Sequence, residues 1–255
     1  NTDGSVNIAG TMTYEDVTSV DAVGIITGRE IINAQKQVHV GTGVSVKAGG
    51  INVTAGITTV QALQATSGTF SADIAVNGGV IVGKGANSVG GNTVLGDNAL
   101  DASVTGANNT AVGFNALTEL TSGANNVAVG GYSGDAITTG QANTALGYSA
   151  LSATTTANYN TAVGRSALQK NTSGASNTAV GRNALKENTT GQYNAAIGHV
   201  TLQFNTTGSN NTAIGNEALD ANTTASSNTA IGAAALSANT TGTLNTAVGH
   251  LALTA

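Results

Sequence analysis

The sequence predicts an all-β protein: a 17-residue-repeat β-solenoid, or β-roll, preceded by an irregular β-rich shaft segment. Three observations lead to this prediction. A phrase close to Asn-Thr-Ala-Val-Gly begins ten times from Asn92 onward, always 17 residues apart, glycine holds a fixed place in it, and aliphatic residues keep register with that glycine. Such a period is too short for a helix pair or a propeller blade. It suits one solenoid coil made of two short strands and two turns.

The consensus of the repeat is N-T-A-V-G-x-x-A-L-x-x-N-T-T-G-x-x, and its residues are identified below by their place, from one to seventeen. Glycine holds place five in every coil and place fifteen in seven of nine, with Ala157 and Ala225 as the exceptions. These glycines predict two corners where the backbone needs positive φ or a close approach. A flexible Gly/Ser/Thr linker is the alternative, but linkers do not keep aliphatic residues in strict register. The corner glycines at place five are Gly96, Gly113, Gly130, Gly147, Gly164, Gly181, Gly198, Gly215, Gly232 and Gly249.

Large aliphatic residues recur at places four and nine, and we expect these two ladders to fill the lumen of the solenoid. The ladder at place four is Val112, Val129, Leu146, Val163, Val180, Ile197, Ile214, Ile231 and Val248. The ladder at place nine is Leu117, Leu151, Leu168, Leu185, Leu202, Leu219 and Leu236, with Gly134 as the departure.

Alanine at place three lies next to the aliphatic residue of place four, so the two side chains of a strand point to opposite sides. We therefore expect the alanines on the outer face, where association of three chains about one axis would bury them. A dimer could bury such a stripe too, and tolerance of alanine on an exposed face is the plainer alternative. The predicted interface residues are Ala111, Ala128, Ala145, Ala162, Ala179, Ala196, Ala213, Ala230 and Ala247.

Asparagine occupies place one throughout and place twelve in the later repeats. Its side chain tolerates turns and can bond to the amide of the next coil, which we take as its structural role. The Asn-Thr-Thr phrase also matches the N-glycosylation acceptor pattern, but a match generated by a repeat is weak evidence for glycans.

Composition argues against an ordinary globule and against several functions. Only 8% of the 255 residues are charged and 3% are aromatic, and cysteine, tryptophan and proline are absent. The formal net charge of −5 gives no basic footprint for nucleic acid. No apolar run is long enough to span a membrane. Low charge is unfavourable for a soluble monomer, which favours burial between chains.

The first 91 residues lack the repeat and divide into two segments. Residues 1–37 read as a β-rich connecting segment, and residues 38–91 as a β shaft punctuated by glycines, whose short alternating runs include 74–76 and 80–82. An irregular second solenoid is the alternative for this shaft. Residues 92–255 form the third domain, a solenoid of ten coils with the last incomplete, and we expect the chain to be a piece of a longer protein.

The repeat N-T-A-V-G-x-x-A-L followed by N-T-T-G resembles repeats of phage tail fibres and of large bacterial surface proteins. It is similar in kind to the stacked N-x-A-I-G coils of trimeric autotransporter adhesin heads, whose repeat is shorter. The stretches 10–17 (G-T-M-T-Y-E-D-V) and 23–27 (V-G-I-I-T) resemble segments of virion structural proteins of marine cyanophages.

These resemblances imply a homotrimeric fibre of the tail-fibre type that projects from a virion. Its partners would be itself, other tail or baseplate proteins and a host-surface glycan or protein. A bacterial cell-surface trimeric adhesin, or an extracellular filament, is the alternative. The resemblances imply neither catalytic residues nor cofactors.

The remaining side chains show no pattern typical of catalysis or metal binding. The three histidines, His39, His199 and His250, have no metal-ligand spacing, and acidic residues do not repeat as calcium-binding coils require. We expect no enzyme, cofactor or metal site. A glycan-degrading β-helix would need a carboxylate cluster, and an ice-binding solenoid a Thr-x-Thr strand, so both are disfavoured.

Place six varies most, which indicates an exposed position. A solvated face is the plainer interpretation of this place. If the solenoid carries a receptor surface, we expect it on this ladder, at Phe114, Tyr148, Arg165, Arg182, His199 and His250.

Overall fold

The computed structural model describes residues 74–76, 80–84, 87 and 89–254. The chain divides into two compact units, 1–64 and 65–255, and the described residues all belong to the second. The predicted connecting segment 1–37, His39 and most of the shaft 38–91 lie outside the described residues.

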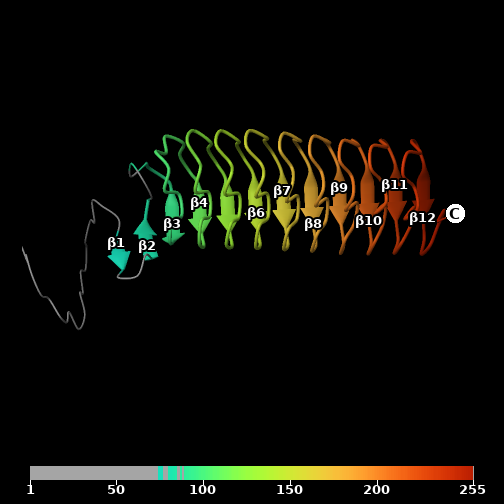
Figure 1. Ribbon diagram of the computed structural model, residues 1–255, viewed down its shortest axis with the longest axis horizontal. Helices are drawn as coiled ribbons and strands as arrows, with labels where there is room; N and C mark the ends of the chain where they lie inside the picture. Colours follow the sequence, from blue (N-terminus) through green and yellow to red (C-terminus); the bar gives the residue numbers. More distant parts are fainter. Residues whose placement is uncertain (1–73, 77–79, 85–86, 88, 255) are drawn as a thin grey trace, which may run out of the picture. The chain divides into compact units, whose positions relative to one another are not determined.

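One sheet of 12 strands runs through the second unit, in the order of the sequence (Figure 1). The strands are β1 (Ile74–Val76), β2 (Val80–Gly83), β3 (Thr93–Gly96), β4 (Thr110–Val112), β5 (Val127–Val129), β6 (Thr144–Leu146), β7 (Thr161–Val163), β8 (Thr178–Val180), β9 (Ala195–Ile197), β10 (Thr212–Ile214), β11 (Thr229–Ile231) and β12 (Thr246–Val248). Each strand from β3 onward pairs in parallel with the next, always between identical places of the repeat. The fold is therefore the predicted all-β solenoid with one coil per 17 residues.

The hairpin of β1 and β2 lies at the start of this sheet. The two strands pair antiparallel with each other, and β2 pairs antiparallel with β3. The hairpin thus occupies the edge of the first coil, whose unpaired backbone groups would otherwise invite another strand. Two of the alternating runs predicted in the shaft, 74–76 and 80–82, are strands in the structure.

Each coil contains one strand, at places two to four, instead of the two strands that the period suggested. The side around place nine is held to the next coil by backbone bonds without forming a strand, as in Leu168 N to Ala184 O at 3.0 Å. Places seven and nine have positive φ in every coil, for example 57° at Ser166 and 49° at Leu168. Alternation with these left-handed residues prevents the extended conformation that a strand needs.

The lumen is filled from both sides by small and large residues in register. The leucines predicted at place nine lie in the interior: Leu117, Leu151, Leu168, Leu185, Leu202, Leu219 and Leu236. The alanines of places three and eight face them from the strand and from the neighbouring turn. Because alanine is short, the leucine can extend across the thin interior without a void.

The predicted orientation of the strand is wrong. The place-three alanines expected at a trimer interface are fully or almost fully buried inside their own coils: Ala111, Ala128, Ala145, Ala162, Ala179, Ala196, Ala213, Ala230 and Ala247. They have no surface to offer to another chain.

The aliphatic ladder of place four accordingly lies outside the lumen. Val129, Ile197 and Val248 are 38%, 41% and 69% exposed. The remaining members are half-buried or similarly exposed: Val112, Leu146, Val163, Val180, Ile214 and Ile231. Places one and three point inward together, since side chains alternate along a strand. Alanine at place three suits a lumen that leucine already fills, and only the first coil carries a larger residue there, Val94.

The asparagine ladders are internal hydrogen-bond columns. In a typical coil, the backbone N–H of Asn177 donates to Asn160 Oδ1 at 3.0 Å, and Asn177 Nδ2 donates to the Gly191 carbonyl at 2.9 Å. At place twelve, Asn188 Nδ2 donates to Asn171 Oδ1 at 2.8 Å. These side chains are buried, so the two columns satisfy backbone groups of the corners that water cannot reach. Asn171 and Asn188, which match the glycosylation pattern, are not accessible in the fold.

The ten predicted corner glycines all have positive φ, between 126° and 147°. Their coils also stack closely: a Cβ added to Gly147 would lie 2.7 Å from the carbonyl carbon and oxygen of Gly164. Only glycine meets both conditions, which explains why place five never varies along the chain.

Candidate binding surface

Charge is confined to one side of the coil. In residues 92–254, every Asp, Glu, Lys and Arg stands at place six, seven, ten or eleven. These places belong to the turn that follows the place-five glycine. The strand and the corner around place fifteen carry no charge, so we call the side formed by places six to eleven the charged edge.

All four cationic side chains of the repeats lie in two adjacent coils, residues 160–193. They are Arg165, Lys170, Arg182 and Lys186, and Glu187 is the one carboxylate beside them, which leaves a formal charge of +3 on these coils. The chain as a whole carries −5. These two coils are therefore positively charged, although the chain as a whole is negatively charged.

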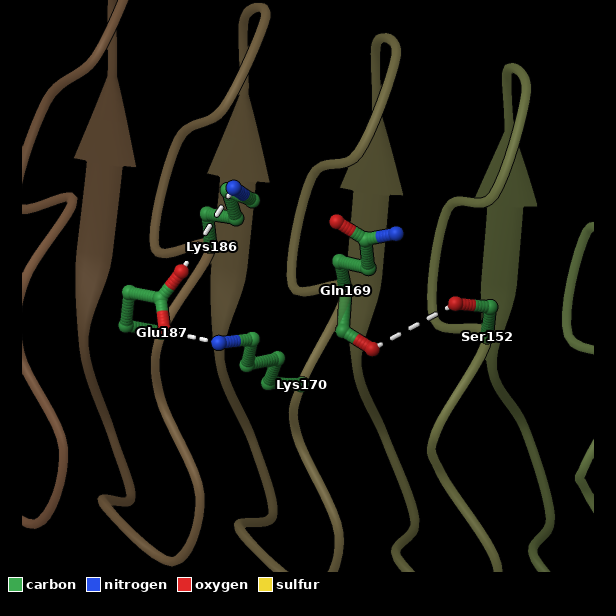
Figure 2. Close-up of polar contacts among 5 residues, drawn as sticks. All are labelled: Ser152, Gln169, Lys170, Lys186 and Glu187. Atoms are coloured by element: carbon green, nitrogen blue, oxygen red, sulfur yellow. Dashed lines mark hydrogen bonds and ion pairs between the residues drawn. The ribbon is translucent and has the colours of Figure 1, made fainter.

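Glu187 lies between two lysines and forms the two ion pairs of the described residues (Figure 2). Its Oε2 is 2.6 Å from Lys170 Nζ of the preceding coil, and its Oε1 is 3.5 Å from Lys186 Nζ. Burial alone would raise the pKa of Glu187, but the hydrogen bond and charge of Lys170 and the charge of Lys186 lower it below the ordinary value. One coil away on the same edge, Ser152 Oγ donates to the Gln169 carbonyl at 3.5 Å (Figure 2).

Arg165 and Arg182 occupy place six of these two coils and are both exposed. Neither guanidinium is paired with a carboxylate in the part of the chain that the structure describes, because both ion pairs there involve lysines. Two like charges close together repel each other. The two arginines thus form an unneutralised cationic pair.

A hydrogen-bonded row continues from Arg182 along place six. Arg182 Nη1 lies 3.0 Å from His199 Nε2, and His199 Nδ1 lies 3.1 Å from Asn216 Oδ1. Because a guanidinium can only donate, Nε2 accepts, and Nδ1 carries the proton that it donates to the asparagine. The row fixes one tautomer of His199 and holds the Arg182 side chain along the ladder.

Aromatic side chains border the cationic coils on both sides. Before them, the Tyr132 ring packs edge-on against Phe114 and Tyr148, with centroids 5.3 and 5.8 Å apart, and Phe114 and Tyr148 are 43% and 53% exposed. Gly131 stands at place six between the two, where an added Cβ would lie 3.6 Å from the Tyr148 ring. After the cationic coils, Phe204 follows Glu187 at place eleven and is also exposed.

Carboxylates flank the cationic coils on both sides: Glu119 and Asp135 share the coils of Phe114 and Tyr132, and Glu217 and Asp220 lie in the coil after Phe204. Burial, partly opposed by backbone hydrogen bonds, raises the pKa of Asp135, and the charge of Glu119 adds to the rise. Burial and the charge of Glu217 likewise raise the pKa of Asp220. Asp135 Oδ1 is buried without a hydrogen-bond partner. Along the stack, the edge therefore passes from coils with both acidic and aromatic side chains, through Tyr148, to the cationic coils, and then through Phe204 to an acidic coil.

The structure places the predicted place-six residues together on one exposed line. Phe114, Tyr148, Arg165, Arg182, His199 and His250 are all exposed. Tyr132, Lys170, Lys186 and Phe204 were missed because they occupy other places of the repeat. The confinement of charge to four places was the signal that would have identified the whole edge.

A second surface is the outer face of β3–β12, formed by places two and four. Place two is mostly threonine, place four is always Val, Ile or Leu, and neither place carries a charge in any coil. Strand pairing at identical places aligns these side chains into two straight ladders. We call this surface the outer sheet face.

Comparisons of the chain with protein families, with curated proteins and with solved structures find no match. The geometry defines the class of protein, a parallel β-solenoid with a 17-residue coil. Within the described residues, no helix could cross a membrane and no group of three His, Cys, Asp or Glu side chains could hold a metal ion.

Proposed function

We propose that the chain is part of a structural fibre of a virion, of the tail-fibre type, which projects from the particle and contributes to attachment to a host surface. Its working unit is a homotrimer, and other tail or baseplate proteins hold it in the virion. The resemblance of the repeat and of the stretches 10–17 and 23–27 to phage proteins supports this assignment. The architecture is compatible with it, since stacked coils extend in one direction as a fibre does.

The observation that carries the proposal is the outer sheet face. Ten aliphatic residues at place four stand half-exposed in register along the sheet. Ten strands of three residues present about 400–500 Å² of nearly flat surface. An exposed apolar patch of a few hundred Å² often marks an interaction site. Self-association would cover it.

A second copy is the partner that fits this face best. The ladders repeat at the coil spacing, so two parallel copies match along their whole length, and no charge opposes contact. A standard interface takes about 800 Å² from each partner. The side chains that flank the ladders must therefore contribute too, as they do when three copies surround one axis. The choice of three copies over two follows from the resemblance to trimeric adhesin heads.

Mass measurement of the purified chain in solution, with matched variants, tests the assembly. Val180→Glu places a charge on the outer sheet face and should dissociate the trimer while leaving the coils folded. Thr190→Glu places the same charge at an exposed position of the opposite corner and should leave the trimer intact. A wild-type chain that stays monomeric, or a Val180→Glu trimer of unchanged stability, would refute the interface.

Labelling of virus particles tests the location. An antibody against residues 92–255 should label the tails of virus particles that contain the protein, as seen in electron micrographs. Labelling of bacterial cell surfaces in the absence of particles would instead support the alternative, a cell-surface trimeric adhesin or an extracellular filament.

A further inference from the structure

We propose that the charged edge between Phe114 and Phe204 is a binding site for an acidic glycan, a saccharide that carries a carboxylate or sulfate group. The inference rests on the proposed function and specifies the chemistry of the host-surface ligand. Its evidence is the order of the exposed side chains along coils two to eight.

The acidic group would bind at the centre of the site. Arg165 and Arg182 are exposed at the same place of adjacent coils, about 4.8 Å apart along the stack, and neither is paired with a carboxylate among the described residues. Planar guanidinium groups recognise oxyanions through paired hydrogen bonds. An anion bound between them would relieve the repulsion that the free protein retains. The bond from Arg182 to His199 holds one of the two in place.

The sugar rings would bind on either side. Tyr148 precedes Arg165 in the place-six ladder and Phe204 lies one coil beyond Lys186, and both rings are about half exposed. A large exposed ring offers an apolar face to the C–H groups of a pyranose, and a tyrosine hydroxyl can bond to its polar groups. Tyr132 packs edge-on against Tyr148, which reduces the side-chain conformational freedom that Tyr148 would lose on binding.

The flanking acids distinguish a glycan from other anionic ligands. Glu119 and Asp135 lie on one side of the cationic coils, and Glu217 and Asp220 on the other. Carboxylates accept hydrogen bonds from sugar hydroxyls, but they repel a phosphate backbone that continues past the arginines. A saccharide with sparse negative charge suits this alternation. A nucleic acid or a run of acidic residues in a peptide does not.

The site is extended instead of hollowed. Its place-six side chains, Tyr148, Arg165 and Arg182, are spaced by the coil rise along one ladder, so an elongated saccharide can contact several of them at once. Such weak contacts add along one chain, and again across the copies of an assembled fibre. The geometry therefore favours an oligosaccharide over a single sugar.

Titration calorimetry of the 255-residue chain at low salt tests the site with defined probes. Hyaluronan hexasaccharide supplies carboxylates, and chondroitin sulfate hexasaccharide adds sulfates. Maltohexaose is the neutral control. Hexaglutamate and a six-residue oligothymidylate are anionic controls that lack pyranose rings. We expect the two acidic saccharides to bind, with the tighter one identifying the preferred acid, and the other three probes to bind at least about tenfold more weakly.

Variants connect the binding to the named side chains. Arg165→Gln combined with Arg182→Gln should weaken the acidic saccharides about tenfold or more, and Tyr148→Ser combined with Phe204→Ser should weaken them without changing the response to salt. Lys84→Gln removes one positive charge outside the repeats and should change affinity less than about twofold. The substituted edge residues are exposed, so equal thermal unfolding of all variants serves as the check on folding.

Three results would overturn the inference. They are no binding of either acidic saccharide, full affinity in the arginine or the aromatic variant, and equal or tighter binding of hexaglutamate or the oligothymidylate. The last would assign the edge to a peptide or nucleic acid. None of them would alter particle labelling or the mass of the assembly, so failure of this inference is distinguishable from failure of the proposed function.

Discussion

The side chain of Ile137 fills the space that a leucine at position 134 would occupy. A Cβ added to Gly134 would lie 3.0 Å from Ile137 Cδ1 and 3.1 Å from Leu117 Cδ2. Position 134 is place nine, where the other coils carry leucine, and position 137 is place twelve, where the later coils carry asparagine. The third coil has thus exchanged the leucine of place nine for an aliphatic residue at place twelve, whereas the second coil buries leucine at both places, Leu117 and Leu120.

This exchange predicts strong coupling between the two positions. Ile137→Asn should lower the free energy of unfolding by about 2–4 kcal/mol because it leaves a cavity beside Gly134. Gly134→Leu should lower it by about 1–3 kcal/mol because it overpacks against Ile137. The double variant restores the consensus, and at the φ of 57° found here the other coils hold leucine. Denaturation of the four proteins should give a favourable coupling of about 1 kcal/mol or more. Additive effects would show that the two side chains do not share one space.

The asparagine column at place one predicts a large loss on truncation. In Asn177→Ala, the buried N–H of Asn194 loses Asn177 Oδ1, its acceptor, whereas the Gly191 carbonyl keeps the bond from Asn188 Nδ2 at 3.0 Å. One orphaned buried donor costs about 1–3 kcal/mol, so we expect a loss of about that size in denaturation. Asn158→Ala is the control: Asn158 Oδ1 accepts from Gln141 N at 2.7 Å on the surface, where water replaces it, and the loss should stay below about 1 kcal/mol. Similar losses in both variants would contradict the internal role of the column.

The pKa of Glu187 predicts how stability depends on acid. Its pKa is lowered in the folded protein, mainly through Lys170 against the effect of burial, so the ionised form is favoured by folding. The contribution of this group is fully present above the unfolded pKa, near the ordinary value of 4.5, and is lost as pH falls through the lower folded pKa. Glu187→Gln should therefore flatten the decline in stability below pH 4.5, as measured by denaturation across the acid range.

Asp135 and Asp220 act with the opposite sign. Burial raises the pKa of each, so the folded state favours the protonated form, and each group reduces stability as pH rises from the ordinary value of 3.8 through the folded pKa. Asp135→Asn should remove the loss of stability that the ionised Asp135 carboxyl causes as pH rises.

For Glu187, the contrary outcome is a pH profile that Glu187→Gln leaves unchanged. It would mean that the ion pairs with Lys170 and Lys186 do not contribute to stability in solution.

The repeat was sufficient to predict the coil, its register and its corners, because one glycine and one leucine recur in fixed places. It was not sufficient to orient the strand. We assigned the larger residue, such as Val180, to the interior and Ala179 to the surface. The thin lumen reverses this choice, since leucine from the opposite side already fills most of its width. The pattern of variation along the strand would have indicated the correct orientation. Places one and three, represented by Asn177 and Ala179, share a face and scarcely vary along the repeats, whereas places two and four vary.

Left-handed residues were a second feature that the pattern did not reveal. Leu168 and its equivalents have φ near 50°, a conformation that costs a residue with a Cβ about 1–2 kcal/mol. Nothing in the repeat marks this, because leucine is not selected for its φ. The cost is offset by burying the side chain and by pairing the backbone with the next coil. Local preference gives way here to packing along the whole stack.

The orientation of β8 yields the last prediction. Ala179 is fully buried, whereas Val180 stands on the outer sheet face. Ala179→Leu adds three methyl-sized groups to a filled lumen and should reduce the free energy of unfolding by about 1–3 kcal/mol or more. Val180→Leu adds one such group at the surface and should change it by less than about 0.5 kcal/mol. The two substitutions differ by one position in the chain and end in the same residue, so propensity cannot account for a difference between them. Denaturation of both variants under conditions that dissociate the chains would isolate the coil itself. A larger loss from Val180→Leu than from Ala179→Leu would mean that the strand faces the other way.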